Sequence, residues 1–245
     1  MLPLDHIPFY DENPDELALG FGKLGFTVSP PSRYTAPDHP DAEWRGRCIF
    51  TADGWLDLLF DENPRNPGAP MACLFRAPDL AAAIAEGAIL NPGEPVRLER
   101  RWRGEADLPA ESFVYAELRS RIAPVGLAVI AHAWPCVDVR TEWFEHANGA
   151  RRIVGLIFGG EAPGPAAPSA GRLLDLSSLD YWSQAAFDAA FPGTRARRAL
   201  RVTVDDLART RAALAANGAR FLEMEAGIAV PAQFGLTCGV LFRGG

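Results

Sequence analysis

Short segments in which hydrophobic and polar positions alternate recur along the chain, and short segments with helical spacing lie between them. Alternation is typical of a strand with one buried face, whereas helical spacing is typical of a helix with an apolar stripe. The predicted strands are residues 4–10, 23–28, 54–59, 71–76, 96–102, 112–118, 125–132, 152–158, 199–204, 220–225, 228–230 and 239–242. The predicted helices are residues 16–19, 80–86, 178–191 and 206–217. This mixture predicts an α+β protein.

One pattern occurs three times: an acidic residue begins a short helix, a glycine ends it, and strands flank both. The copies cover residues 15–26, 78–88 and 205–219. Acidic residues suit helix N-termini, and glycine suits the left-handed residue that ends a helix. Another copy should begin with the strand at 152–158, but residues 161–171 are rich in proline, alanine and glycine, so this third module looks degenerate.

The repeats predict four βαβββ modules that pair as first with second and third with fourth. We expect tandem modules forming curved mixed sheets with helices on the outer face, and a cleft between the sheets of each pair. The boundary falls near residues 135–150, which divides the chain into domains 1–135 and 136–245. A chain of 245 residues is long enough for one large domain or two small ones.

Composition narrows the classes of partner. The formal net charge is -7, and the basic runs at 100–103 and 195–198 are too short for a nucleic-acid or anionic membrane surface. The chain contains no apolar stretch of transmembrane length. Its four cysteines are widely spaced, no C-x-x-C pair occurs, and we expect no secretory leader. These features predict a reducing, cytoplasmic location.

The letters from Gly20 to Gly25 match the dinucleotide-binding expression G-x-G-x-x-G. That fingerprint requires a strand before the glycines and a helix after them, whereas here a helical segment comes first and a predicted strand follows. We therefore interpret these glycines as the end of a helix. Phosphate-binding loop, nucleophile-elbow and zincin motifs do not occur in the sequence.

The first module and one later motif carry a family resemblance. The order of predicted elements in residues 4–59, together with the run His146-Ala147-Asn148-Gly149-Ala150, is similar to the glyoxalase-like branch of the vicinal oxygen chelate superfamily, which includes glyoxalases, bleomycin resistance proteins and dioxygenases. In that branch a histidine-x-Asn-Gly-Ala junction precedes the second half. The superfamily is functionally mixed, so the resemblance implies a fold more than a reaction.

The resemblance implies a metal site. The superfamily's enzymes hold a divalent metal with His, Gln and Glu residues on inward-facing strands. His6 matches the first-strand position, and Asp57 matches the last-strand position, where a Glu is usual and one methylene longer. His132, at the end of a strand of the second module, is the predicted third ligand. Two histidines and one carboxylate suit Fe, Mn, Zn or Ni and would polarise a carbonyl.

The alternative for His6 is a hydrogen-bonded core histidine. The second module offers Ala72 or Cys73 at the equivalent position, so it supplies no imidazole there. The strands at 200–204 and 239–242 contain no His, Asp or Glu, and we expect the second half to be structural.

Other candidates concern the substrate. Trp55 shares the alternation phase of Asp57, so we expect it to face the same cavity. Trp134 is a further predicted lining residue, and Arg47 and Tyr115 are predicted anchors for an anionic group. His146 could act as a catalytic acid or base at the mouth of the cleft, but the interpretation we favour is an Asn-Gly turn with a histidine bound to the loop backbone. His39 is expected in a surface loop.

Three functions remain open at this level. The first is a metal-dependent lyase, isomerase or oxygenase acting on a small carbonyl or vicinal-oxygen compound. The second is a metal-free protein that sequesters a small hydrophobic or cationic compound. The third is a fold whose site has decayed. Dimerisation is common in the superfamily, but four modules in one chain could complete both clefts, so monomer and homodimer both stay open.

Overall fold

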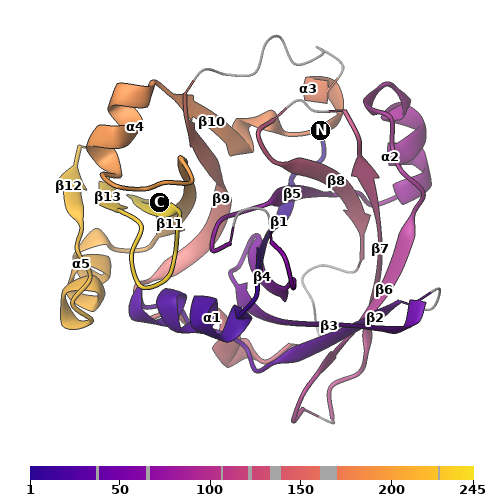
Figure 1. Ribbon diagram of the computed structural model, residues 1–245, viewed down its shortest axis with the longest axis horizontal. Helices are drawn as coiled ribbons and strands as arrows, with labels where there is room; N and C mark the ends of the chain where they lie inside the picture. The colour runs from indigo at the N-terminus through magenta and orange to yellow at the C-terminus, as the bar shows by residue number, and fades with distance from the viewer. Residues whose placement is uncertain are drawn as a thin grey trace.

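The computed structural model describes residues 1–36, 39–64, 67–105, 107–120, 123–132, 139–160, 170–225 and 227–245. Its first part forms a closed barrel in the strand order β1-β4-β3-β2-β6-β7-β8-β5 (Figure 1). The barrel strands are β1 (Leu4–Asp11), β2 (Ser32–Ala36), β3 (His39–Phe50), β4 (Trp55–Phe60), β5 (Ala72–Arg76), β6 (Val96–Trp102), β7 (Glu111–Leu118) and β8 (Gly126–Ala131). The barrel closes because β1 pairs with β4 in parallel and with β5 in antiparallel orientation.

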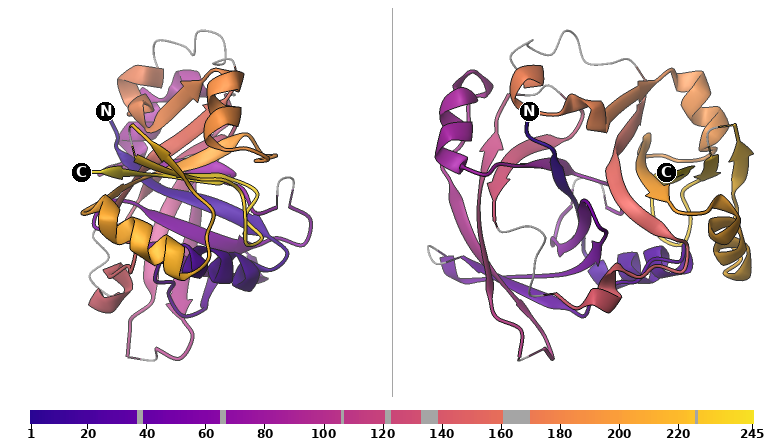
Figure 2. Two further views of the ribbon diagram at one scale, coloured as in Figure 1. Left: turned by 90° about the vertical axis from the view of Figure 1, so that its left-hand side faces the viewer. Right: turned by 180° about the vertical axis from the view of Figure 1, so that it is seen from behind.

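The second part is a six-stranded sheet in the order β10-β9-β11-β14-β13-β12. Its strands are β9 (Ala150–Gly159), β10 (Leu179–Trp182), β11 (Arg198–Val204), β12 (Leu222–Met224), β13 (Gly227–Val230) and β14 (Gly239–Gly244). Figure 2 shows the barrel as a ring with this sheet packed against one side, where β9 contacts β1 and β4. The strands on both sides of this contact contribute to one continuous hydrophobic core.

Helices lie outside the β-structure. The barrel carries α1 (Pro14–Lys23) and α2 (Leu80–Glu86), and the sheet carries α4 (Gln184–Ala190) and α5 (Leu207–Ala216) (Figure 1). Each begins at a side-chain cap, since Asn13, Asp79, Ser183 and Asp206 accept a hydrogen bond from a backbone N–H of the first turn. The short elements are α3 (Ala170–Leu173), η1 (Ala88–Leu90), η2 (Thr141–Phe144) and η3 (Leu176–Ser178). The α+β class, with curved sheets and outer helices, is confirmed.

The predicted helix at 80–86 coincides with α2, and the helix at 206–217 is α5. The predicted strand at 23–28 is wrong, because Phe26 and Thr27 bind Phe21 and His146 through their backbone N–H groups and pair with no strand. The helix predicted at 178–191 begins only after Ser183, since residues 179–182 form β10 beside β9.

The sequence did not reveal β2 and β3, because prolines before and between them favoured a loop. His39, expected in a loop, is the first residue of β3, and its backbone faces Ala36 of β2. The predicted domain boundary falls at 135–136, outside the described residues, and the division into two domains stays a prediction. Among the described helices, none has the length and apolar character needed to cross a bilayer.

Candidate functional site

The barrel interior contains a cavity of about 450 Å³. Residues of alternating position on the strands face it, as expected for the inner side of a barrel. Its walls are mostly apolar and aromatic, and its polar lining groups include His6, Tyr34 and Asp57. The complete lining is His6, Pro8, Tyr10, Tyr34, Trp44, Asp57, Leu59, Ala72, Leu74, Val96, Leu98, Phe113, Tyr115, Glu117, Leu118, Gly126, Leu127 and Ala128.

A layer of large side chains fills the interior beside this cavity. Trp55, Trp102 and Phe50 pack together with Trp143 of η2. Trp55 is 2% exposed and is absent from the cavity lining. Its indole stacks on the His6 imidazole at a centroid distance of 4.1 Å. Trp55 therefore lies on the same strand face as Asp57 but behind the residues that line the cavity, and its role in substrate binding stays a prediction.

One polar cluster is centred on the carboxylate of Asp5. His6 Nδ1 lies 2.7 Å from Asp5 Oδ1, His132 Nε2 lies 3.0 Å from both carboxylate oxygens, and Trp55 Nε1 donates to Oδ1 at 3.2 Å. Neighbours on a regular strand point to opposite faces. Here the register of β1 against β5 shifts between Leu4 and His6, and such a bulge redirects a side chain.

Asp5 is held as an anion. Burial would raise its pKa, but hydrogen bonds from His132 and His6 hold the pKa of the carboxyl well below its usual range. Because a carboxylate only accepts hydrogen bonds, both contacting ring nitrogens carry a proton. The remaining nitrogen of His6, Nε2, has no hydrogen-bond partner among the described residues, and His6 lines the cavity.

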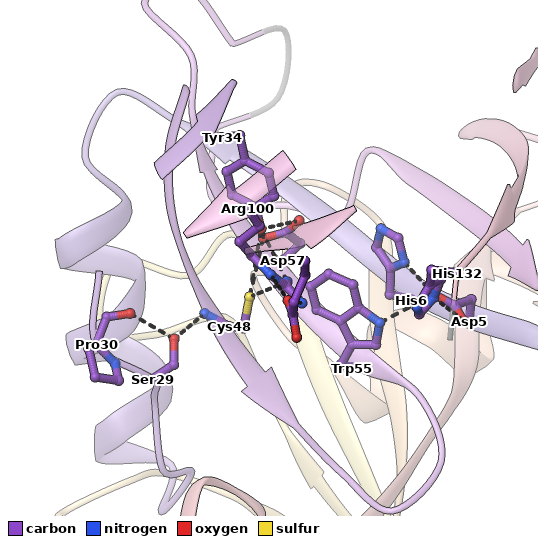
Figure 3. A network of polar contacts seen from close by, with 11 residues as sticks. Asp5, His6, Ser29, Pro30, Tyr34, Cys48, Trp55, Asp57, Arg100 and His132 are labelled. Carbon is purple, nitrogen blue, oxygen red and sulfur yellow. Dashed lines mark hydrogen bonds and ion pairs between the residues drawn. The ribbon is translucent and has the colours of Figure 1, made fainter. Parts of the chain in front are cut away.

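The other polar cluster joins Asp57, Tyr34, Cys48 and Arg100 (Figure 3). Arg100 connects this cluster to Glu111. The Tyr34 hydroxyl lies 2.7 and 2.9 Å from the two Asp57 oxygens, and Arg100 Nη1 donates to it at 3.4 Å. Arg100 also donates through Nε to Glu111 Oε2 at 2.6 Å. Burial raises the pKa of Asp57, while Arg100 opposes that rise. Burial also raises the pKa values of Tyr34 and Cys48 well above their usual ranges.

The predicted metal ligands lie in different clusters. His6 and His132 converge on Asp5, whereas Asp57 is held by Tyr34, and Trp55 lies between the two groups (Figure 3). Across the described ranges, no three His, Cys, Asp or Glu side chains form a group that could hold a metal ion. The three predicted ligands are therefore not assembled into one group in the described part of the chain, and the metal role of His6, Asp57 and His132 stays a prediction.

Among the comparisons with known proteins, only the one with solved structures finds a match. No family model matches the sequence, and no curated protein matches it. Among solved structures, a mutant of 4-hydroxymandelate synthase from Streptomyces coelicolor superimposes with a TM-score of 0.58 and 10% identity, over 99% of this chain and 92% of that one. A xylose isomerase-like TIM barrel/4-hydroxyphenylpyruvate dioxygenase fusion protein gives a TM-score of 0.50 and 13% identity, over 99% of this chain and 48% of that one.

This chain has the vicinal oxygen chelate fold. At these identities the likeness concerns the fold alone. The glyoxalase-like branch, suggested by the sequence, remains part of the proposal below.

The other residues that the sequence predicted for the site do not gather in one place. Tyr115 lines the cavity. Trp134 lies outside the described residues. Arg47 is on the outside of the barrel, where Nε forms an ion pair with Asp15 Oδ1 and Nη1 donates to the Ser29 carbonyl, and it is absent from the lining.

His146 lies between backbone groups, away from the barrel cavity. Its Nδ1 accepts from the Thr27 N–H at 3.0 Å, and its Nε2 lies 2.7 Å from the Phe50 carbonyl oxygen. Both ring nitrogens are occupied, and the residue is 2% exposed. These contacts give the ring a structural role, although its partners are Thr27 and Phe50 and not the Asn-Gly turn of the predicted alternative, and they give no support to catalysis by His146.

Sequence reasoning missed Asp5, Tyr34 and Arg100. Asp5 stands beside His6, and strict alternation would have placed it on the opposite face. Tyr34 and Arg100 belong to paired strands, β2 and β6, where they face each other in register. A buried arginine near a buried carboxylate has no local pattern, so only the pairing of distant strands reveals it.

Proposed function

We propose that this protein binds a small, largely apolar organic molecule inside the barrel. The observation that carries the proposal is the cavity of about 450 Å³, whose walls are mostly aromatic and aliphatic and whose few polar groups include His6, Tyr34 and Asp57. Ligand sites commonly combine apolar walls with a small number of positioned polar groups. The hydrogen bonds of Asp5 and Arg100 hold the surrounding side chains in place, so the site is largely preformed.

Filling the cavity tests this proposal. Ala72 lines the cavity, whereas Ala52 lies in an exposed turn. We expect Ala72→Leu to weaken binding of a small aromatic ligand, found by thermal-shift screening, by at least about tenfold, because the added methyl groups occupy ligand space. Ala52→Leu, the matched control, should leave affinity unchanged. Equal affinity in both variants, measured by calorimetry, would show that the ligand lies elsewhere.

A second candidate is a metal-dependent enzyme of the glyoxalase-like kind, a lyase, isomerase or oxygenase acting on a small carbonyl or vicinal-oxygen compound. It is favoured by the shared fold with 4-hydroxymandelate synthase and by the agreement of His6 and Asp57 with the family positions. The described side chains do not gather around a metal, so we rank this candidate second.

Metal content decides between the two candidates. Untagged protein and its His6→Ala and Asp57→Ala variants would be analysed by inductively coupled plasma mass spectrometry. Near-stoichiometric metal in the parent, lost in both variants, would favour the enzyme. A parent protein that takes up no Fe, Mn, Zn or Ni would leave metal-free binding as the function.

A further inference from the structure

The charged lining of the cavity is acidic. Asp57 and Glu117 line it, and no lysine or arginine does so among the described residues. Glu117 is the exposed member of this pair, so its carboxylate is close to the solvent end of the cavity. Asp57, which also lines the cavity, is buried. A ligand would therefore meet two carboxyl groups, one buried and one exposed.

The positive charge of Arg100 does not cancel the negative charge of the cavity lining. Its guanidinium is buried behind the lining, forms an ion pair with Glu111, and lies 4.6 Å from the Trp55 ring centroid and 4.7 Å from that of Trp102. The positive charge is therefore already balanced by a carboxylate and by aromatic faces.

Aromatic rings cover much of the wall between the two carboxyl groups. Tyr10, Trp44, Phe113 and Tyr115 all line the cavity. The face of an aromatic ring carries partial negative charge, so it attracts a cation, and desolvation in a closed site strengthens this attraction. An ammonium group that carries alkyl or aryl substituents also buries apolar surface against such walls.

The phenols report the same negative field. Burial raises the pKa of Tyr10, and Tyr115, Asp57 and Glu117 raise it further through charge repulsion. Burial and then Glu117 raise the pKa of Tyr115. The burial contribution opposes a charge of either sign, but the contributions of Asp57 and Glu117 oppose only a negative charge and would stabilise a positive one.

We propose that the ligand of this cavity is a small organic cation, an aryl or alkyl ammonium compound, held by aromatic faces and by the carboxylate of Glu117. This inference rests on the proposed function, because it names the ligand class of the same cavity.

Three probe compounds of similar size but different charge test the proposal that the ligand is a cation. Phenyltrimethylammonium, its neutral isostere tert-butylbenzene and the anion benzoate would be titrated into the full-length protein by calorimetry at neutral pH. We expect the cation to bind at least about tenfold more tightly than the isostere, and benzoate to bind weakest. Equal or tighter binding of tert-butylbenzene or benzoate would overturn the cation proposal alone. If none of the three binds, the proposed function is overturned with it.

Two single-residue variants test whether the carboxylate of Glu117 binds the cation. Glu117→Gln should weaken phenyltrimethylammonium binding by about threefold to tenfold and leave tert-butylbenzene unaffected, since the amide preserves the shape and removes the charge. Glu99→Gln on β6, which does not line the cavity, makes the same change in net charge and should affect neither probe. Equal losses in both variants would indicate only a long-range effect of net charge and would overturn the role of Glu117. Addition of EDTA should leave the affinity unchanged, whereas a loss of cation binding in EDTA would assign the site to a metal.

Discussion

At the scale of single residues, His146 shows how a chemically capable side chain can serve the fold. Its ring connects the backbone of Thr27 with that of Phe50, and these residues are far apart in the sequence. Since the Phe50 carbonyl only accepts a hydrogen bond, Nε2 carries the proton and Nδ1 accepts. Burial lowers the pKa of His146, the Phe50 carbonyl opposes this, and Arg151 and Arg209 lower it further. The buried ring is therefore neutral near pH 7.

Replacement of His146 tests this structural role. His146→Ala should lower the free energy of unfolding by about 2–3 kcal/mol near neutral pH, because a buried N–H and a buried carbonyl lose their partner. Urea unfolding followed by circular dichroism measures the change. Glu142→Ala, at an exposed position of η2, is the control and should remain within about 0.5 kcal/mol. A loss no larger than that of the control would contradict the role assigned to His146.

The lowered pKa of His146 predicts that the free energy of unfolding depends on pH. The folded-state pKa of His146 lies below its ordinary value of 6.5, so the unfolded chain binds more protons as the pH falls through that value. The free energy of unfolding should therefore decrease from about pH 7 to about pH 5. His146→Ala should have a smaller slope in this window, measured by urea titrations at several pH values. An unchanged slope would show that another group is responsible.

At the scale of elements, α1 explains two glycines of the false dinucleotide motif. A Cβ on Gly20 would lie 2.5 Å from the Phe234 carbonyl oxygen, whereas a Cβ on Gly22 would meet nothing within 4 Å. Gly20 therefore permits the close approach of α1 to the loop before β14, and Gly22 only faces solvent. In the G-x-G-x-x-G letters, Gly20 is required by packing, whereas nothing in the described part of the structure requires a glycine at position 22.

These two glycines make a matched pair for mutation. Gly20→Ala should destabilise the protein by about 2 kcal/mol or more, because the contact with backbone must open. Gly22→Ala should stabilise it by about 0.5–1 kcal/mol, because alanine loses less backbone entropy within a helix. Thermal unfolding of both variants against the parent measures the difference. Equal effects of the same sign would refute the packing argument for Gly20.

At the scale of the whole molecule, barrel and sheet share one core. Phe9 and Leu56 of the barrel belong to the same hydrophobic cluster as Leu200 and Val240 of the sheet. Polar contacts cross the same boundary, since the Arg198 guanidinium donates to the Pro70 and Pro124 carbonyls at 2.7 and 2.9 Å. Separation of the two parts would expose this apolar surface to water.

The shared core predicts a single cooperative unfolding transition. In a Trp143→Phe/Trp182→Phe double variant all remaining tryptophans lie between residues 44 and 134, within the predicted domain 1–135, so their fluorescence reports that part, while far-ultraviolet circular dichroism reports the whole chain. The two urea transitions should coincide. Separate midpoints would instead support independent domains at 1–135 and 136–245.

Local patterns of the sequence were sufficient for the α+β class, the capped helices α2 and α5, and most strands. Capping residues and alternation act between neighbours in the chain, so they can be identified without the fold. The same patterns placed His6 and Asp57 on inner faces, and both line the cavity. Alternation predicts on which face of a strand a side chain lies, but it does not predict the position of that side chain along the barrel axis.

Only the tertiary structure decided which side chains meet. A bulge in β1 brings Asp5 to His6, and the pairing of β2 with β6 brings Tyr34 to Arg100, so the predicted ligands separate into two clusters. The closure of the barrel creates the cavity, since β1 must pair with both β4 and β5. Strand order, register and bulges arise from contacts between residues distant in sequence. For this reason the sequence by itself determined the elements and their inner faces, and the three-dimensional pairing of strands determined the site.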